Sequence, residues 1–516
     1  MNVMNIPMRC LLTALLLGVG TGAGAQLELR TEAQLSASGG DHTPLWLNAN
    51  KYGLSSLDRT NGYVRAGLFR PLQLDSARRW GWGAGADVAV AGGFTSTLVV
   101  QQAYGELRWL KGLLTVGSKE QPMELHNQAL SSGPQTLGVN ARPVPGVRLA
   151  MPVYWDVPGL RGWLGLKGHL FYGLTTDDHW QRDFSHRAST YTEHTMLHTK
   201  AGYLRIGPAD KPFTAEMGME MGCQFGGKSH YLSPDGMVTY ENSGGLKGML
   251  RAFVPSGGEA IEDGTVYRNT EGNHVGSYVV RLNLDYDRWG ASVYADHFFE
   301  DQSSMFLLDY DGYGSGDRWN DRVDSRYFRY DLRDMMLGAE VRLKQCPWVS
   351  TIVVEYLYTK YQCGPIYHDH TQLISDHLAG TDNYYNHYLF SGWQHWGQVM
   401  GNPLYRSPLY NDDATIEVNN NRFWAWHLGI GGSPVKGLRY RLLCTIQRGW
   451  GTYYKPLDDP ARNFSLMGEA EYCFPRQSKL QGWSVKGAVG MDRGALLGDN
   501  TGVQLTIGKR LTLGNK

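Results

Sequence analysis

The sequence predicts an all-β protein, a transmembrane antiparallel β-barrel of about 18 strands with long outer loops. Three observations lead to it: a secretory N-terminus, the lack of any apolar window long enough for a membrane helix, and many strand-length segments with alternating polarity. Residues 275–298 show the alternation best. From Gly276 to Tyr286, apolar or small residues alternate with residues such as Arg281 and Asn283. A period of two is the signature of a strand with one apolar face.

The same segment also predicts a membrane-spanning hairpin. Asp287 and Arg288 form a minimal turn, and residues 289–298 return with a second alternating face. Each strand has about 10 residues, the length that a tilted strand needs to cross a bilayer, whereas strands of soluble sandwiches usually have about 5–6. Aromatic side chains fall near the strand ends, as in an interfacial girdle; these are Tyr278, Tyr286, Trp289 and Phe298.

The N-terminus has the three parts of a secretory signal. Arg9 supplies a positive charge, Leu11–Val19 an apolar stretch, and Ala23–Ala25 a small-residue cleavage motif. We therefore expect residues 1–25 to be a signal peptide and residues 26–516 to form one outer-membrane barrel domain. No window reaches the 18 or so apolar residues of a membrane helix.

Charge and cysteine content exclude other classes. Basic and acidic residues both number 49, so no electrostatic case for nucleic-acid binding exists. Beyond the signal peptide the cysteines are scattered and odd in number, which predicts no disulfide framework; they are Cys223, Cys346, Cys363, Cys444 and Cys473.

Alternating segments recur along the chain. The predicted strands are Leu27–Ala37, Gly62–Arg70, Trp80–Val90, Leu98–Trp109, Leu113–Lys119, Val147–Pro152, Trp163–Gly173, Leu197–Ile206, Phe213–Gln224, Val275–Tyr286, Trp289–Phe298, Asp334–Lys344, Val349–Lys360, Phe423–Gly431, Leu438–Arg448, Asn463–Cys473, Gly482–Met491 and Gly502–Thr512. In each, we expect the apolar face to meet lipid and the polar face to line the lumen.

The connections support an up-and-down barrel. Short turns such as Asp287–Arg288 fall on one side, and long loops such as Tyr361–Arg422 fall on the other. Outer-membrane barrels have short periplasmic turns and longer extracellular loops. We therefore expect both termini in the periplasm and the long loops at the cell surface. One loop is predicted to carry a short helix, Ser243–Phe253, because its apolar residues follow helical spacing.

Four stretches resemble the Wzi capsule-assembly family in the form found in Bacteroides-like bacteria. They are Thr43–Leu54, Leu137–Val147, Gly272–Ser304 and Thr381–Tyr405, and the last is the most specific. The resemblance implies an 18-stranded outer-membrane barrel that binds capsular polysaccharide. The family is not known as a family of enzymes. Its best-described glycan-binding surface belongs to proteobacterial members, whose loop pattern does not match here, so the resemblance assigns no individual residue.

The loop Asp382–Asn402 is the first candidate glycan site. Flat aromatic rings can lie against the C–H faces of sugars, while Asn and Asp can hydrogen-bond their hydroxyls. The alternative is that the loop folds into the lumen and packs on itself. The candidate residues are Asp382, Asn383, Tyr384, Tyr385, Trp393, Trp396 and Asn402.

Three charged residues outside that loop complete the candidates. Arg142, in a two-proline approach to a strand, is placed to meet an acidic polysaccharide or to pair with a lumen carboxylate. Glu300 and Asp301 leave the outer end of a strand. As neighbours in an extended segment they point to opposite faces, which suits loop ordering better than glycosidase chemistry.

Other chemistry finds no support in the sequence. His368–His370 places two histidines on one side, but no third ligand is visible, so we predict no metal site. No serine in a nucleophile elbow, no glycine loop leading into a helix and no CxxC motif occurs. We predict a non-enzymatic protein without cofactors.

The functional hypothesis is therefore a monomeric surface lectin in the outer membrane. It would contact membrane lipid and bind capsular or extracellular polysaccharide during capsule assembly, with polysaccharide export proteins as a further class of partner. A porin-like diffusion channel is the alternative, because barrels of 16–18 strands can leave an aqueous pore.

Overall fold

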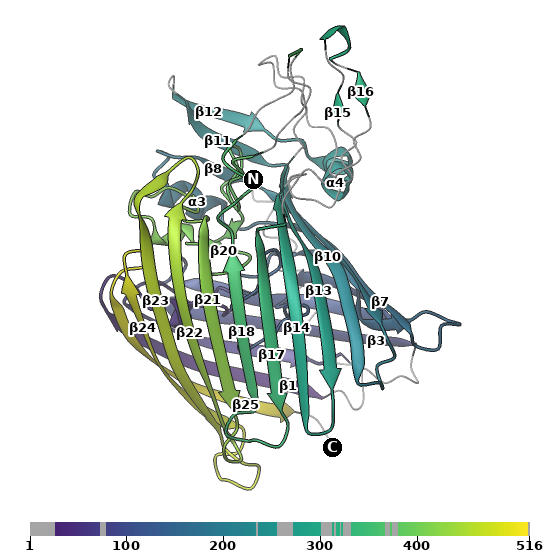
Figure 1. Cartoon of the computed structure of the whole chain (residues 1–516). Coiled ribbons are helices and arrows are strands. Elements are labelled where there is room, and N and C mark those ends of the chain that lie inside the picture. The colour runs from purple at the N-terminus through teal and green to yellow at the C-terminus, as the bar shows by residue number, and fades with distance from the viewer. Residues whose placement is uncertain are drawn as a thin grey trace.

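A closed barrel of 18 antiparallel strands forms the body of the computed structural model (Figure 1). The structure describes residues 26–72, 79–233, 236–254, 272–300, 312–313, 316–319, 321–323, 332–366, 372–373 and 380–513. The first strand pairs with the last, from Leu27 opposite Leu513 to Gly39 opposite Thr501, which closes the barrel. The predicted fold class is thus confirmed.

The wall strands follow one another around the barrel in chain order. They are β1 (Leu27–Gly39), β2 (Thr60–Arg70), β3 (Trp80–Gly92), β4 (Leu98–Trp109), β5 (Gly112–Ser118), β6 (Gly146–Asp156), β7 (Leu164–Leu174), β9 (Met196–Ile206), β10 (Phe213–Phe225), β13 (Asn273–Asp285), β14 (Trp289–Glu300), β17 (Met335–Leu343), β18 (Thr351–Tyr358), β21 (Phe423–Gly432), β22 (Leu438–Gly451), β23 (Pro456–Cys473), β24 (Trp483–Gly494) and β25 (Asn500–Leu513).

The two faces of these strands differ as the alternation predicts. On β17, Leu337 and Val341 are 48% and 38% exposed, whereas Met336 and Glu340, each one position before them, are buried. An outward apolar face and an inward face that carries polar groups are what a lipid-embedded barrel requires. None of the helices in the described ranges is long and apolar enough to cross a membrane.

The long connections all leave one end of the barrel, here the long-loop end, and both described chain ends lie at the other, the short-turn end. Exposed tryptophans gather at the short-turn end; they are Trp80, Trp109, Trp163, Trp289 and Trp348. Trp80 and Trp109 stack with ring centroids 5.9 Å apart. Such a ring of indoles fits a membrane interface.

Smaller elements occupy the long-loop end. Helix α2 (Leu45–Asn48) and helix α3 (Asp178–Phe184) were not predicted, whereas α4 (Gly245–Phe253) matches the predicted loop helix. A small sheet of β8 (Tyr191–Glu193), β11 (Lys228–Ser233) and β12 (Gly236–Glu241) rises above the rim (Figure 1). The remaining elements are the strand pairs β15 (Gly312–Tyr313) with β16 (Arg322–Val323) and β19 (Gln394–His395) with β20 (Gln398–Val399), and the 3₁₀ turns η1 (Gly316–Arg318) and η2 (Pro408–Tyr410).

Loops that turn inward fill the lumen. The largest buried cluster combines residues of three loops, 40–59, 119–145 and 359–422, with side chains of the barrel wall. Trp46 of α2 is buried and donates Nε1–H to Thr445 Oγ1 of β22 at 3.1 Å. We call the described residues of these three loops the plug. The main apolar core of the described chain thus lies inside the barrel.

Candidate functional site

A single buried carboxylate of the wall holds loop 119–145 in place. Glu355 on β18 is fully buried. Its Oε1 accepts from Ser131 Oγ at 2.6 Å and Tyr294 OH at 2.5 Å, and its Oε2 accepts from the Ser132 amide at 2.8 Å. Four donors in all reach this group, since Ser132 Oγ also donates to it. Loop and wall therefore share one hydrogen-bond network.

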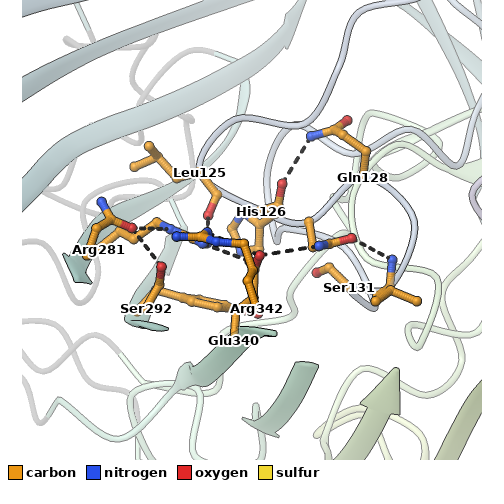
Figure 2. Close-up of polar contacts among 12 residues, drawn as sticks. Leu125, His126, Gln128, Ser131, Arg281, Ser292, Glu340 and Arg342 are labelled. Atoms are coloured by element: carbon orange, nitrogen blue, oxygen red, sulfur yellow. Dashed lines mark hydrogen bonds and ion pairs between the residues drawn. The ribbon is translucent and has the colours of Figure 1, made fainter. Parts of the chain in front are cut away.

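A second polar network fixes the other part of the same loop (Figure 2). Arg281 on β13 donates to the Leu125 carbonyl and to Glu340 Oε2, each at 2.7 Å. Arg342 approaches Glu340 Oε1 at 3.3 Å, and His126 Nε2 lies 3.1 Å from Asp296 Oδ2. The loop therefore contacts three further strands, β13, β14 and β17.

The aromatic loop packs onto loop 119–145 rather than facing outward. Tyr384, Tyr385, Trp393 and Asn402 are each at most 1% exposed. The Trp393 indole donates to the Thr136 carbonyl at 3.0 Å, Tyr385 OH donates to the Gln135 carbonyl, and the Asn402 amide group donates to Ser132 Oγ at 3.3 Å. These four residues lie inside the plug. Their positions are those expected if the loop folds into the lumen and packs on itself.

The polar candidates at the start of this loop also make internal contacts. Asn383 Oδ1 accepts from Asn421 Nδ2 at 2.6 Å, and Asp382 is partly buried beside it. Glu300 is buried at the end of β14 and accepts the Tyr385 amide at 3.0 Å, which is a loop-ordering contact. Asp301 lies outside the described residues.

Trp396 and Arg142 form a different environment at the long-loop end. The Trp396 ring is partly exposed, and the Arg142 guanidinium lies 4.5 Å from its centroid. Arg142 donates to Ser96 Oγ at 2.9 Å and Thr95 Oγ1 at 2.8 Å, both neutral groups rather than a lumen carboxylate. Burial lowers the pKa of Arg142 to about 10, partly opposed by the charge of Asp177. The group is still a cation at neutral pH.

Helix α3 adds aromatic rings that the sequence analysis missed. Trp180 and Phe184 stack with centroids 4.9 Å apart and are both partly exposed. The Trp180 ring lies against Gly397, where an added Cβ would come within 2.6 Å of it. The Trp396 amide donates to Asp177 Oδ2 at 3.0 Å, which joins the two segments. We name this group the α3–Trp396 surface; its members are Arg142, Asp177, Trp180, Phe184 and Trp396.

His395 brings the three contributing loops together beneath this surface. Its Nε2 accepts the Thr176 amide at 3.2 Å and its Nδ1 donates to the Arg142 carbonyl at 2.9 Å. The aromatic run of residues 178–184 was a usable sequence signal. Only the fold, however, places it beside a residue more than 200 positions later.

The described part of the chain contains no group of three or more His, Cys, Asp or Glu side chains arranged to hold a metal. His368, Asp369 and His370 lie outside the described residues. The candidate surface therefore offers partly exposed aromatic rings, behind which Arg142 (8% exposed) and Asp177 (0% exposed) are buried. Such rings can lie against the C–H faces of sugars.

Comparisons with known proteins find similar folds but no similar sequences. No protein-family model matches the chain, and no curated protein matches its sequence. One solved structure is Wzi of Escherichia coli, described as an outer membrane protein involved in group 1 capsule assembly and a carbohydrate-binding β-barrel. It aligns with a TM-score of 0.51 and 11% identity, over 94% of this chain and 85% of that one.

Two further structures align less well. OprD of Pseudomonas aeruginosa gives a TM-score of 0.44 at 10% identity, over 96% of this chain and 98% of that one. OccAB4 of Acinetobacter baumannii gives 0.46 at 10% identity, over 95% and 99%. At 11% identity the alignment with Wzi establishes the fold alone: the chain has the architecture of an outer-membrane β-barrel.

Proposed function

We propose that this protein is an outer-membrane surface lectin that binds and anchors capsular or extracellular polysaccharide. Its long loops would face outward and its termini the periplasm. The observation that carries the proposal is the α3–Trp396 surface, a set of partly exposed aromatic rings backed by the buried side chains of Arg142 and Asp177. The similarity in fold to a carbohydrate-binding barrel supports it.

The chemistry of the surface suits sugar binding. The rings of Trp180 and Trp396 offer flat faces for sugar C–H groups. Two buried groups position Trp396: Asp177 accepts its amide and Arg142 lies over its ring. The plug gives this surface a rigid base, so little conformational entropy is lost when a ligand binds. A long polymer would hold on by many weak contacts across many barrels.

The plug weighs against a porin-like channel. A diffusion pore needs a continuous aqueous path, whereas loops 119–145 and 359–422 bond to each other and loop 119–145 bonds to the wall. The Wzi structure of similar fold is described as a carbohydrate-binding barrel, and we propose no catalytic activity for this protein.

Binding by purified barrel tests the proposal. Depolymerised fragments of the cell's own polysaccharide avoid avidity and report the single site. Trp396→Ala and Trp180→Ala each remove one aromatic ring. The loss of about 1 kcal/mol of binding free energy should weaken fragment binding roughly fivefold in each variant. Trp393→Ala is unsuitable, because Trp393 is buried and its loss would disturb the plug.

Tyr454→Ala is the matched control. Tyr454 is a 69% exposed aromatic residue in the turn between β22 and β23, at the same end of the barrel. Its removal should leave fragment binding unchanged. Equal binding by folded Trp396→Ala, Trp180→Ala and wild-type protein would refute the α3–Trp396 surface as the site.

A further inference from the structure

A cavity of about 150 Å³ lies inside the barrel, between the plug and one section of the wall. Strands β5, β6, β7 and β9 form the wall side, and loop 119–145 with Trp393 and Met400 forms the plug side. Pro122 on its lining is exposed, so the cavity communicates with solvent. Cavities of about this volume can hold a six-membered ring.

Arg148 brings a positive charge into this cavity and interacts with the carboxylate of Glu124 only electrostatically, without a hydrogen bond. On β6, its neighbours Val147 and Leu149 are 49% and 58% exposed on the outer face, so Arg148 points inward. It makes no hydrogen bond and no ion pair with any residue that the structure describes, although it lines the cavity. Cations inside proteins are normally paired, because an unpaired one is costly.

The other charges around the cavity are already engaged. Lys119 pairs with Glu106, and the carboxylate of Glu124 is bound by Lys167 at 2.7 Å. Arg142 donates to the hydroxyls of Ser96 and Thr95 and keeps its charge. The cavity therefore has an excess of positive charge, carried mainly by Arg148 with Arg142 at its margin.

The rest of the lining suits a sugar ring rather than a bare inorganic anion. His169 Nε2 and Thr199 Oγ1 lie 3.1 Å apart on adjacent strands and offer hydrogen bonds to hydroxyls. Thr115 adds a third polar group, while Phe171 and Leu197 supply an apolar side. A few polar groups among apolar lining residues are typical of small-molecule sites.

We propose that this cavity binds a single sugar unit bearing a carboxylate, with Arg148 holding the carboxylate. The proposal rests on the proposed function in that it names the class of glycan, an acidic one. A guanidinium is the side chain best suited to a bidentate contact with a carboxylate. Either a uronic acid unit of a polymer or a free sugar acid supplies this chemistry.

Calorimetric titration of the purified full-length barrel with glucuronate tests the proposal, with glucose as the neutral comparison. Wild-type protein should bind glucuronate at least tenfold more tightly than glucose, and the preference should shrink in high salt. Arg148→Gln should reduce glucuronate binding at least tenfold. Arg148 makes no hydrogen bond or ion pair with the described residues and interacts with Glu124 only electrostatically, so this variant should fold. Heat-modifiable gel mobility checks that it does.

Arg439→Gln is the control, since Arg439 is an exposed wall arginine at the short-turn end, paired with Glu471 at 2.9 Å. It should bind glucuronate as wild type does. No glucuronate binding by wild type, equal binding of glucose, or wild-type binding by Arg148→Gln would each overturn the proposal.

A uronate-containing oligosaccharide distinguishes the two sources of the carboxylate, and the two variants together distinguish the cavity proposal from the lectin proposal. A uronate-containing oligosaccharide that competes with glucuronate supports a polymer unit as occupant, and lack of competition supports a free sugar acid. If Trp396→Ala no longer binds polysaccharide fragments while Arg148→Gln still binds glucuronate, the cavity proposal is refuted and the surface lectin is supported. If Trp396→Ala still binds fragments while Arg148→Gln no longer binds glucuronate, the surface lectin is refuted and a carboxylate site in the lumen is supported.

Discussion

Individual buried polar side chains of the wall determine the position of the plug. Glu355 receives hydrogen bonds from Ser131 and Ser132 of the loop and from Tyr294 of the neighbouring wall. A buried acceptor of this kind is valuable mainly because its loss leaves several donors without partners. The contact therefore fixes the position of loop 119–145 more than a surface ion pair would.

Glu355→Ala should destabilise this junction by about 3 kcal/mol, because the serine and tyrosine donors would remain buried and unsatisfied. Thermal unfolding followed by near-UV circular dichroism measures the loss. Val354→Ala, the adjacent outward-facing position, is the control and should cost less than 1 kcal/mol. Equal melting temperatures of the Glu355 and Val354 variants would contradict this role.

The sequence could identify the aromatic loop as special but not the direction in which its rings point. Tyr385 and Trp393 carry the composition of a sugar site, yet their hydrogen-bond partners, Gln135 and Thr136, lie about 250 positions earlier. Nothing in the local pattern encodes such a pairing. Trp396 is distinguished from Trp393 by its surroundings: Arg142 lies over its ring, and the next residue, Gly397, lies against Trp180.

Elements of the wall, in contrast, could be predicted because period-two alternation is a local signal. The predicted strand Asn463–Cys473 became β23, which begins earlier at Pro456. The added residues pair with β22 around the register shift near Gly449 and Gly451, where alternation is interrupted. Helix α3 and sheet β8–β11–β12 lack a long periodic segment, so only α4, with its apolar residues at helical spacing, was foreseen.

The junction between the start of β17 and the plug should respond to pH. Asp334 accepts the amides of Tyr361 at 3.0 Å and Gln362 at 2.6 Å. Burial raises the pKa of Asp334 to about 6 from its usual 3.8, although these hydrogen bonds oppose the rise. A raised pKa means that the folded state binds the proton more tightly, so this group favours folding below about pH 4 and its contribution is lost as pH rises through 6.

Hydrogen exchange at the Tyr361 and Gln362 amides measures this effect. After correction for intrinsic rates, protection at pH 4.5 should exceed protection at pH 7 by roughly tenfold. In Asp334→Asn the difference should vanish. A pH dependence that survives this substitution would assign the effect to another group.

The whole molecule combines a membrane barrel with an interior core. Barrels of 18 strands enclose a lumen wide enough for water, and here three loops occupy it with a continuous apolar cluster. Strand number and loop side follow from sequence patterns, but whether loops turn inward or outward does not. That choice depends on how their side chains fit the wall and one another.

Excising residues 387–417 should open the barrel. Asn386 and Val418 already hydrogen-bond to each other at 2.8 and 3.0 Å, so a short Gly-Ser linker can join them without straining the wall. In planar bilayers the intact protein should show no steady current, and the shortened protein should conduct. Steady current through the intact protein would favour the channel alternative, and silence from a folded shortened barrel would mean that the other loops suffice to close it.

The most direct test of the central claim is the partition of polysaccharide between cells and medium, with and without this gene. The lectin account predicts that cells lacking the protein make normal amounts of polymer and shed it, that the wild-type gene restores retention, and that Trp396→Ala restores it only in part. Polymer that stays cell-bound in the absence of the gene would contradict a role in anchoring it.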